Sequence, residues 1–469
     1  MVCTVGPASE HPETLKRLIT AGMDVARFNF SHGSHDEHGR RIGRVRKAAQ
    51  EVGKRVGIML DTKGPEIRLG LFQGGKASLA KGEAFVLYTG ERMGNSQGAS
   101  VSYPGFPDLV RRGSTVLLDD GNIGLEVKDV SRDEVACVVL NSGIIKDRKR
   151  ISIPGAQLDI PMLDSKDRDD LLYGARLGVD FVAASFVRSR QDVLDIRRVL
   201  VEAGSRAKII AKIESCQGVQ ALSEILEEAD GLMIARGDLG VEFPPEEIPL
   251  LQKSMIAQAL SVGKPVITAT QMLESMVEHP RPTRAEASDV ANAILDGTDA
   301  VMLSAETAAG KYPVEAVGFM ARIATRTEAS LNPSLFIPKL IRGSVSDVTQ
   351  AVSRSVIAAA DELGAAAIVT PTESGHTARM VARFRPKMPV YAVTPHDETA
   401  GWLSLTWGVE ATVCPQIASG QEEDVSEASL QALMAKRLVT AGDLCVITKG
   451  VPKGIAGTTN AMEIRSAGN

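Results

Sequence analysis

Short apolar runs rich in Val, Ile and Leu alternate with amphipathic stretches along most of this 469-residue chain. Stretches with helical spacing follow these runs, as in Pro12–Thr20, Gln191–Ala203, Pro249–Ser261 and Pro313–Ala329. Alternating strand and helix patterns predict a parallel sheet, and eight such repeats can close into a (β/α)8 barrel. The eight predicted strands are Val2–Val5, Met23–Phe30, Val56–Leu60, Phe181–Phe186, Lys208–Ile213, Gly231–Ala235, Pro265–Thr270 and Ala300–Ser304.

The stretch 66–162 interrupts this alternation. It has no strong helical periodicity and carries short alternating runs, which predict a small all-β domain inserted after the third barrel strand. Its predicted strands are Ala84–Tyr88, Thr115–Leu118, Ile123–Val127 and Glu134–Leu140. Without the insert, residues 1–65 and 163–330 together have about the length of one barrel.

A third block covers residues 331–469. It has predicted helices near Val348–Leu363 and Val425–Thr440, with short apolar runs between and after them. A block of this length can form its own core. We therefore expect an α/β protein with a barrel, an inserted all-β domain and a C-terminal α/β domain.

Charge and cysteine content exclude several classes of protein. The chain has 53 Lys and Arg against 58 Asp and Glu, a net charge of −5, whereas generic binding to nucleic acid or membrane surfaces needs a basic field. Its five cysteines show no C-x-x-C spacing, which argues against zinc or a disulfide framework. There is no basic leader with a long apolar stretch and no run of about 18 apolar residues. We expect a cytoplasmic protein with no nucleic-acid or membrane partner.

Polar residues gather where the predicted barrel strands end. In a (β/α)8 barrel, ligands bind at the carboxyl ends of the strands, and period-2 alternation places Lys212 and Glu214 on one face. One such charge alone is more often a solvated residue or a rim ion pair, but burying several near one axis is costly without bound charge. The polar residues at seven strand ends are Arg27, Asn29, Ser31, Asp61, Thr62, Lys63, Ser185, Lys212, Glu214, Arg236, Asp238, Thr270, Gln271, Ser304 and Glu306.

Three groups within this set suggest ligands. Glu214 and Asp238 form the carboxylate pattern of a Mg2+ or Mn2+ site, and Arg27 with Lys212 suggests an anionic, phosphate-bearing substrate. The turn Gly237–Gly240 either offers backbone N–H groups to a carboxylate or phosphate, or is an ordinary strand-to-helix turn. A last set of oxygen donors suits either a monovalent cation or a hydrogen-bonded rim network, and spacing alone favours the network. That set is Asn29, Ser31, Asp61 and Thr62.

Histidines and nucleotide motifs offer no alternative site. The seven histidines show neither H-E-x-x-H nor His-Asp-Ser order, and we interpret His35 and His38 as solvated helix residues. Neither G-x-x-x-x-G-K-[ST] nor G-x-G-x-x-G occurs. A bound nucleotide is therefore expected to be held by other means.

Several long motifs closely resemble the pyruvate kinase family, and the resemblance extends over essentially the whole chain. It implies transfer of a phosphoryl group from phosphoenolpyruvate to ADP, with Mg2+ or Mn2+ and K+ as cofactors and the inserted β-barrel acting as a lid. It also implies a homotetramer. The motifs are Thr4–Ser9, Ala26–Gly33, Leu60–Arg68, Ala211–Glu214, Ala235–Gly240, Thr268–Met276, Arg281–Glu286 and Asp289–Asn292.

The resemblance implies a role for each candidate residue. Arg27 and Lys212 would contact the phosphoryl group, and backbone N–H groups of Gly237 and Asp238 with Thr270 would hold the substrate carboxylate. Thr270 and Ser304 would relay a proton. Glu214 and Asp238 would bind Mg2+. K+ would bind at Asn29, Ser31, Asp61 and Thr62, so for this set the resemblance favours a cation site, whereas spacing alone favours a hydrogen-bonded network. Glu66 is the residue type found at this position in the K+-dependent members of the family. The nucleotide contacts would be Arg68, Lys149, Pro7 and His32.

The resemblance also leaves points open. Arg150 departs from the family, since a small residue often precedes the lid's return strand. In the C-terminal domain, hydroxyl and N–H groups at a helix start would bind a phosphorylated effector, although an ordinary capped turn explains them too. These residues are Thr372, Ser374, Gly375, His376 and Thr377. A metal-dependent pyruvate-enolate lyase or aldolase, and a catalytically silent binding scaffold, remain as alternatives.

Overall fold

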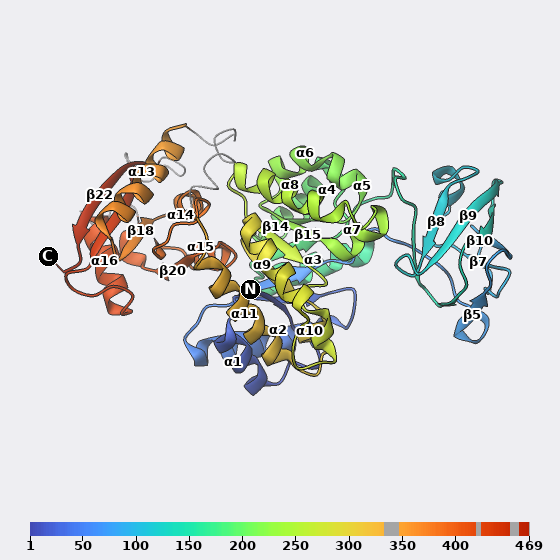
Figure 1. Cartoon of the computed structure of the whole chain (residues 1–469), viewed down its shortest axis with the longest axis horizontal. Helices are drawn as coiled ribbons and strands as arrows, with labels where there is room; N and C mark the ends of the chain where they lie inside the picture. Colours follow the sequence, from blue (N-terminus) through green and yellow to red (C-terminus); the bar gives the residue numbers. More distant parts are fainter. Residues whose placement is uncertain (333–346, 419–423, 451–458, 469) are drawn as a thin grey trace.

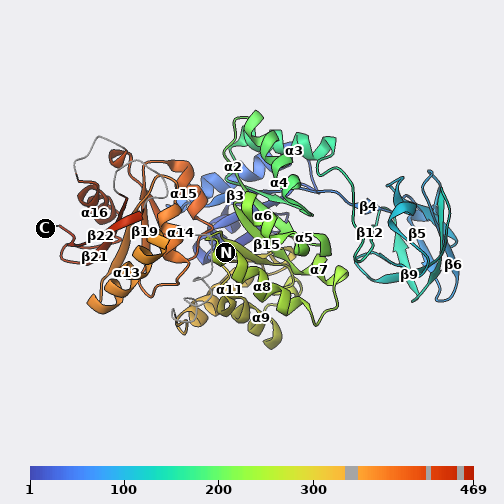
Figure 2. The ribbon, with the colours of Figure 1, turned by 90° about the horizontal axis from the view of Figure 1, so that it is seen from above.

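The computed structural model describes residues 1–332, 347–418, 424–450 and 459–468. Three parts lie in a row, with the inserted β domain at one end, the barrel in the middle and the C-terminal domain at the other end (Figure 1). The view from above shows the same order (Figure 2). The predicted fold class, a (β/α)8 barrel with an all-β insert and a C-terminal α/β domain, is confirmed.

Eight parallel strands close the barrel in the order β1-β17-β16-β15-β14-β13-β3-β2. Because neighbouring strands run parallel, their carboxyl ends meet at one end of the barrel; Asn29, for example, is level with Asp61 of the next strand. The strands are β1 (Val2–Thr4), β2 (Val25–Asn29), β3 (Gly57–Asp61), β13 (Phe181–Ala184), β14 (Lys208–Ile213), β15 (Gly231–Ala235), β16 (Val266–Ala269) and β17 (Ala300–Leu303).

Helices cover the outside of the barrel, and capping residues set where several of them begin. Helix α2 begins with a reciprocal capping box between Ser34 and Glu37 and ends at Gly53, whose φ of 74° suits glycine. In the described part of the chain, none of the helices has the length and apolar character needed to cross a bilayer. The barrel helices are α1 (Pro12–Ala21), α2 (His35–Val52), α3 (Ser165–Leu177), α4 (Arg190–Glu202), α5 (Cys216–Gln220), α6 (Leu222–Glu228), α7 (Arg236–Glu242), α8 (Ile248–Ser261), α9 (Arg284–Asp296), α10 (Ala305–Ala308) and α11 (Pro313–Glu328).

The inserted domain has one core between two sheets, a seven-stranded sheet ordered β4-β12-β8-β9-β10-β6-β7 and a β11-β5 pair. Strands β4 and β12 pair antiparallel, with Arg150 opposite Arg68, where the chain leaves and rejoins the barrel. The strands are β4 (Ile67–Arg68), β5 (Lys76–Leu79), β6 (Ala84–Tyr88), β7 (Gly98–Ser100), β8 (Thr115–Leu118), β9 (Ile123–Val130), β10 (Glu134–Val139), β11 (Gly143–Lys146) and β12 (Arg150–Ser152).

The C-terminal domain is a five-stranded sheet ordered β20-β19-β18-β21-β22, in which only β22 is antiparallel to its neighbour. The prediction that its last helix reaches Thr440 is wrong: the helix ends at Ala435, because Arg437 takes a φ of 58° and turns the chain. The elements are α13 (Asp347–Leu363), β18 (Ala367–Pro371), α14 (His376–Ala382), β19 (Val390–Thr394), α15 (Asp397–Leu403), β20 (Val409–Val413), α16 (Val425–Ala435), β21 (Leu444–Gly450) and β22 (Thr459–Ser466).

A buried arginine joins the C-terminal domain to the barrel. Arg385 is almost fully buried, and its guanidinium forms an ion pair with Asp299 at 3.1 Å and donates to the carbonyl of Gly297 at 2.5 Å. Its Cζ also lies 4.9 Å from the centre of a ring of Trp407. Breaking a buried ion pair is strongly destabilising, so this contact holds the two domains in a defined orientation.

Candidate active site

Side-chain alternation explains why charged residues converge inside the barrel mouth. Met59, Ile210 and Met233 belong to the cluster that fills the barrel interior, whereas their strand neighbours belong to the outer core under the helices. Since successive side chains point to opposite faces, Asp61 follows Met59 to the interior and Lys212 follows Ile210. The same period carries Glu214, two residues beyond Lys212, to the interior.

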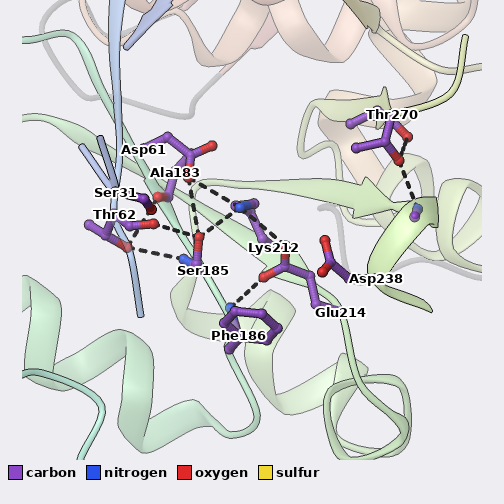
Figure 3. A network of polar contacts seen from close by, with 12 residues as sticks. Ser31, Asp61, Thr62, Ala183, Ser185, Phe186, Lys212, Glu214, Asp238 and Thr270 are labelled. Carbon is purple, nitrogen blue, oxygen red and sulfur yellow. Dashed lines mark hydrogen bonds and ion pairs between the residues drawn. The ribbon is translucent and has the colours of Figure 1, made fainter. Parts of the chain in front are cut away.

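Lys212 lies at the centre of a buried polar network (Figure 3). Its Nζ is 3.1 Å from Asp61 Oδ1 and 3.1 Å from Glu214 Oε1, and it donates to Ser185 Oγ at 2.6 Å. Burial disfavours the ammonium ion, but Asp61 and Glu214 outweigh this cost and raise the pKa of Lys212. Lys212 is therefore a positive charge at neutral pH, in a place where water cannot screen it.

Arg27 adds a second fixed cation beside this network. Its Nε donates to Asp61 Oδ2 at 2.6 Å, and its Nη1 donates to Thr4 Oγ1 at 2.9 Å. Burial alone would raise the pKa of Asp61, but Arg27 and Lys212 together lower it below its usual range. Arg27 and Lys212 share Asp61, and Lys212 also contacts Glu214, so two buried cations lie close together as a binding point for an anionic substrate.

Glu214 and Asp238 form the predicted carboxylate pair. Glu214 accepts a hydrogen bond from the backbone N–H of Phe186 at 2.6 Å, and Asp238 lies next to it (Figure 3). Burial, opposed by Lys212 and reinforced by Asp238, raises the pKa of Glu214 to about 7. Asp238 forms an ion pair with Arg150 of the lid. Two hard oxygen donors that need positive charge fit a divalent cation completed by substrate and water.

The described residues contain no group of three or more His, Cys, Asp or Glu side chains placed to bind a metal by themselves. A cation at Glu214 and Asp238 would therefore have to take its remaining ligands from elsewhere. This is usual for Mg2+, which keeps several waters and binds through one or two carboxylates together with substrate phosphates.

Two of the four oxygen-bearing residues assigned to a monovalent cation accept backbone hydrogen bonds with their side chains. Asn29 Oδ1 accepts from the backbone N–H of Ser31 at 3.0 Å, and Thr62 Oγ1 accepts from the backbone N–H of Ser185 at 3.1 Å. Ser31, Thr62 and Asp61 are drawn together at one side of the network (Figure 3). Both interpretations, a hydrogen-bonded rim network and a cation site, are compatible with these contacts.

The residues assigned to the substrate carboxylate and the proton relay lie beyond the carboxylate pair. The backbone N–H of Gly237 donates to Thr270 Oγ1 at 2.8 Å, so this N–H group already has a partner. Thr270 Oγ1 donates in turn to the carbonyl of Ala269 at 2.7 Å, and Thr270 has a φ of 64°. The backbone N–H of Ser304 donates to Glu306 at 2.7 Å. A direct role for Ser304 stays a prediction.

The predicted nucleotide contacts lie partly on the lid and partly on the barrel. On the lid, Arg68 donates from Nε to Glu66 at 2.8 Å, and Lys149 forms an ion pair with Asp119 at 2.6 Å. On the barrel, Pro7 and His32 are exposed in loops that follow β1 and β2. The two lid cations are thus held by lid carboxylates, and would have to exchange these partners for phosphate to reach a nucleotide.

The interpretation of His38 as a solvated residue is wrong. Its side chain is buried, stacks on Phe30 with ring centres 4.1 Å apart, and donates from Nε2 to the carbonyl of His32 at 2.7 Å. His35 is half-buried, at 2.7 Å from Asp170 and stacked on a tyrosine. Helical spacing could not show this, because helix α3, over 100 residues later, covers this face.

The predicted effector residues span the loop after β18 and the start of α14, which begins at His376. Thr372 Oγ1 accepts from the backbone N–H of Gly375 at 3.0 Å, and Gly375 has a φ of 75°. The hydroxyls of Thr377 and Thr459 lie 2.7 Å apart. Burial lowers the pKa of His376 to about 4, so its ring is neutral at physiological pH. Ser374 donates no side-chain bond to this turn, and its carbonyl accepts from Arg379 at 3.4 Å.

Two functional arrangements were missed from the sequence. Ser185 was noted only as a strand end, yet its hydroxyl connects Lys212 with Asp61, at 2.6 and 3.2 Å. Arg236 pairs with Asp289 at 2.6 Å and donates to the carbonyl of Thr270 at 2.9 Å, so its charge already has partners. Strand parity could have suggested Ser185, but the direction of Arg236 depends on a partner from helix α9.

The fold and the site define a class: a (β/α)8-barrel enzyme that binds an anionic substrate among buried cations and carboxylates at the ends of its strands. The family described as pyruvate kinase, barrel domain, matches residues 1–317, and pyruvate kinase, alpha/beta domain, matches residues 350–465. The chain belongs to the pyruvate kinase family. The predicted resemblance is confirmed, and membership argues against the lyase alternative.

Individual relatives agree over nearly the full length. The chain is 51% identical to a pyruvate kinase of Geobacillus stearothermophilus, over 99% of this chain and 79% of that protein. It is 50% identical to one of Bacillus licheniformis, over 100% of this chain and 80% of that protein. Its structure is similar to a pyruvate kinase from Cryptosporidium parvum with a TM-score of 0.93 and 40% identity, covering 99% of this chain and 95% of that one.

Proposed function

We propose that this chain transfers the phosphoryl group of phosphoenolpyruvate to ADP, giving pyruvate and ATP. The observation that carries the proposal is the position of Lys212 Nζ, 3.1 Å from each of two buried carboxylates and next to Arg27. Phosphoryl transfer depends mainly on positioning and on positive charge around the transferred group. Similarity to pyruvate kinases over 99% or more of this chain supports the same reaction.

Arg27 and Lys212 bind the phosphate of the substrate in this proposal. Both side chains are about nine-tenths buried, so their charges act in a medium where electrostatic interactions are strong. The substrate carboxylate lies against the N-terminus of α7. The backbone N–H of Asp238 faces the carboxylate, and the backbone N–H of Gly237 leaves Thr270 Oγ1 and donates to the carboxylate instead. Lys212 then stabilises the phosphoryl group during transfer.

Glu214 and Asp238 would hold Mg2+ or Mn2+, and Asn29, Ser31, Asp61 and Thr62 would hold K+. The raised pKa of Glu214 and the ion pair of Asp238 with Arg150 support the divalent site, because both show carboxylates that need positive charge. When bound, these cations neutralise negative charge on the phosphate oxygens.

The enolate left after transfer must gain a proton on carbon. Thr270 is the proposed donor, because its hydroxyl is placed between the Gly237 N–H and the Ala269 carbonyl. Ser304 would assist through water. ADP would be positioned by Arg68 and Lys149 of the lid and by Pro7 and His32 of the barrel. Closure of the lid would exclude water, which could otherwise take the phosphoryl group.

A direct assay tests this function. Purified protein is mixed with phosphoenolpyruvate, ADP, Mg2+ and K+, and ATP is measured. We expect ATP formation that requires both substrates and stops when the divalent cation is chelated. Absence of ATP with and without K+ would reject the proposal.

Replacing K+ by Na+ at equal ionic strength is expected to reduce ATP formation by about tenfold or more. The Asn29, Ser31, Asp61 and Thr62 oxygens must match the cation's size, and Glu66 belongs to the residue type of K+-dependent members. The measurement is the initial rate in each salt at saturating substrate. Equal rates would contradict a K+ site and favour the hydrogen-bonded network.

The proposal also includes an effector site in the C-terminal domain and an oligomeric state. A phosphorylated effector would bind at the residues Thr372, Ser374, Gly375, His376 and Thr377. Its binding should change how the rate of ATP formation depends on the phosphoenolpyruvate concentration. We also propose a cytoplasmic homotetramer, on the similarity to the family. Sedimentation of the purified protein tests the assembly.

A further inference from the structure

The lid contributes one side chain to the carboxylate pair on the barrel. Arg150 begins strand β12, and its Nη1 donates to Asp238 Oδ1. The side chain is only 12% exposed, and its Cζ lies 4.5 Å from the centre of the Phe186 ring. The backbone N–H of the same Phe186 binds Glu214. Arg150 is thus packed into the place proposed for the divalent cation.

Electrostatics hold the guanidinium there. Burial disfavours its charge, but Asp238, Glu214 and Glu66 outweigh burial and raise the pKa of Arg150. On the other side of the carboxylate pair, Lys212 is 3.1 Å from Glu214 Oε1. The pair therefore has one fixed cation from the barrel and one cation from the lid.

The contact also connects the lid with the barrel. Arg150 lies opposite Arg68 in the β4–β12 pair, which we call the lid hinge because the chain leaves and rejoins the barrel there. Arg68 bonds Glu66 and not the carboxylate pair on the barrel. The neighbouring Lys149 pairs with Asp119 of the lid. In the described ranges of the chain, no other ion pair joins residues 66–162 to the barrel. The position of Arg150 is therefore coupled to that of the lid.

We propose that Arg150 is a tethered counter-cation that neutralises Asp238 and Glu214 in the absence of divalent metal, and that it must leave Asp238 when the metal binds. The inference rests on the divalent site of the proposed function. Two cations at the same carboxylate oxygens repel each other, so Arg150 weakens metal binding. By linkage, metal binding weakens the docking of the lid hinge to the same extent.

The test measures Mn2+ binding to the full-length protein without substrate, by electron paramagnetic resonance. Arg150→Met keeps the aliphatic packing on Phe186 and removes the charge, and we expect it to bind Mn2+ about tenfold more tightly than wild type. Arg150→Lys keeps a positive charge and should stay closer to wild type. Arg132→Met, at an exposed turn of the lid, is the matched control and should not change the affinity.

Hydrogen exchange provides the second readout. In wild type, Mn2+ should accelerate exchange in hinge peptides containing Ile67 and Ile151, whereas in Arg150→Met exchange should already be fast without Mn2+. Equal or weaker Mn2+ binding by Arg150→Met would overturn the inference, while loss of binding in Glu214→Gln would show that the site itself stands. No Mn2+ binding by wild type or Arg150→Met would overturn both.

Discussion

Replacing Lys212 by methionine is expected to lower kcat by about 10²- to 10³-fold or more, with phosphoenolpyruvate binding largely retained. The reason is that Lys212 Nζ lies among Asp61, Glu214 and Ser185 in a buried position, where its charge stabilises the transferred phosphoryl group more than the ground state. The measurements are the rate of ATP formation and the affinity for phosphoenolpyruvate by calorimetry.

Lys47→Met is the control for this variant, because Lys47 is exposed on helix α2 and far from the strand ends. It should leave both quantities unchanged. Turnover in Lys212→Met equal to wild type would support a catalytically silent scaffold and contradict the proposed role. A loss of substrate affinity equal to the loss of kcat/KM would instead assign Lys212 to binding alone.

Asp61→Asn is expected to reduce the free energy of unfolding by about 3 kcal/mol, as well as activity. Asp61 is the buried partner of both Arg27 and Lys212, at 2.6 and 3.1 Å. Without its charge, Arg27 loses its ion-pair partner and Lys212 keeps only Glu214, so two cations in a buried site share fewer carboxylates. The measurement is urea denaturation of the barrel, together with the rate of ATP formation.

Asp129→Asn removes the same charge from an exposed position on β9 and should have little effect on stability. Because high phosphate can supply negative charge to Arg27 and Lys212, phosphate should restore stability to Asp61→Asn more than to wild type. Unfolding free energies equal to within about 0.5 kcal/mol would contradict the role given to Asp61.

Much of the barrel could be predicted from local pattern. Strands Lys208–Ile213 and Gly231–Ala235 were predicted with their observed bounds, since strands covered by helices on one side and filled on the other are apolar throughout. The same regularity placed Lys212 and Glu214 together, because two residues on one strand with period 2 share a face without any knowledge of the rest of the fold.

Errors arose where packing or a turn of the backbone, and not helical periodicity, decides the environment of a residue. His38 has the polar side chain of a solvated helix position, but Phe30 and the carbonyl of His32 enclose it. Helix α16 ends before its predicted bound because Arg437 turns the backbone, which no periodic signal marks. The domain boundaries and the roles of Ser304 and the effector loop stay predictions.

The sequence by itself determined the alternation of strands and helices, the barrel they form, and which side chains stand at the strand ends, because these follow from local periodicity and the handedness of parallel connections. Only the tertiary structure decided how those charges pair. Asp61 pairs with Arg27 and Lys212, Glu214 also contacts Lys212, and Asp238 pairs with Arg150 of the lid. Pairing energies depend on distance and burial in three dimensions, which the order of residues along the chain does not contain.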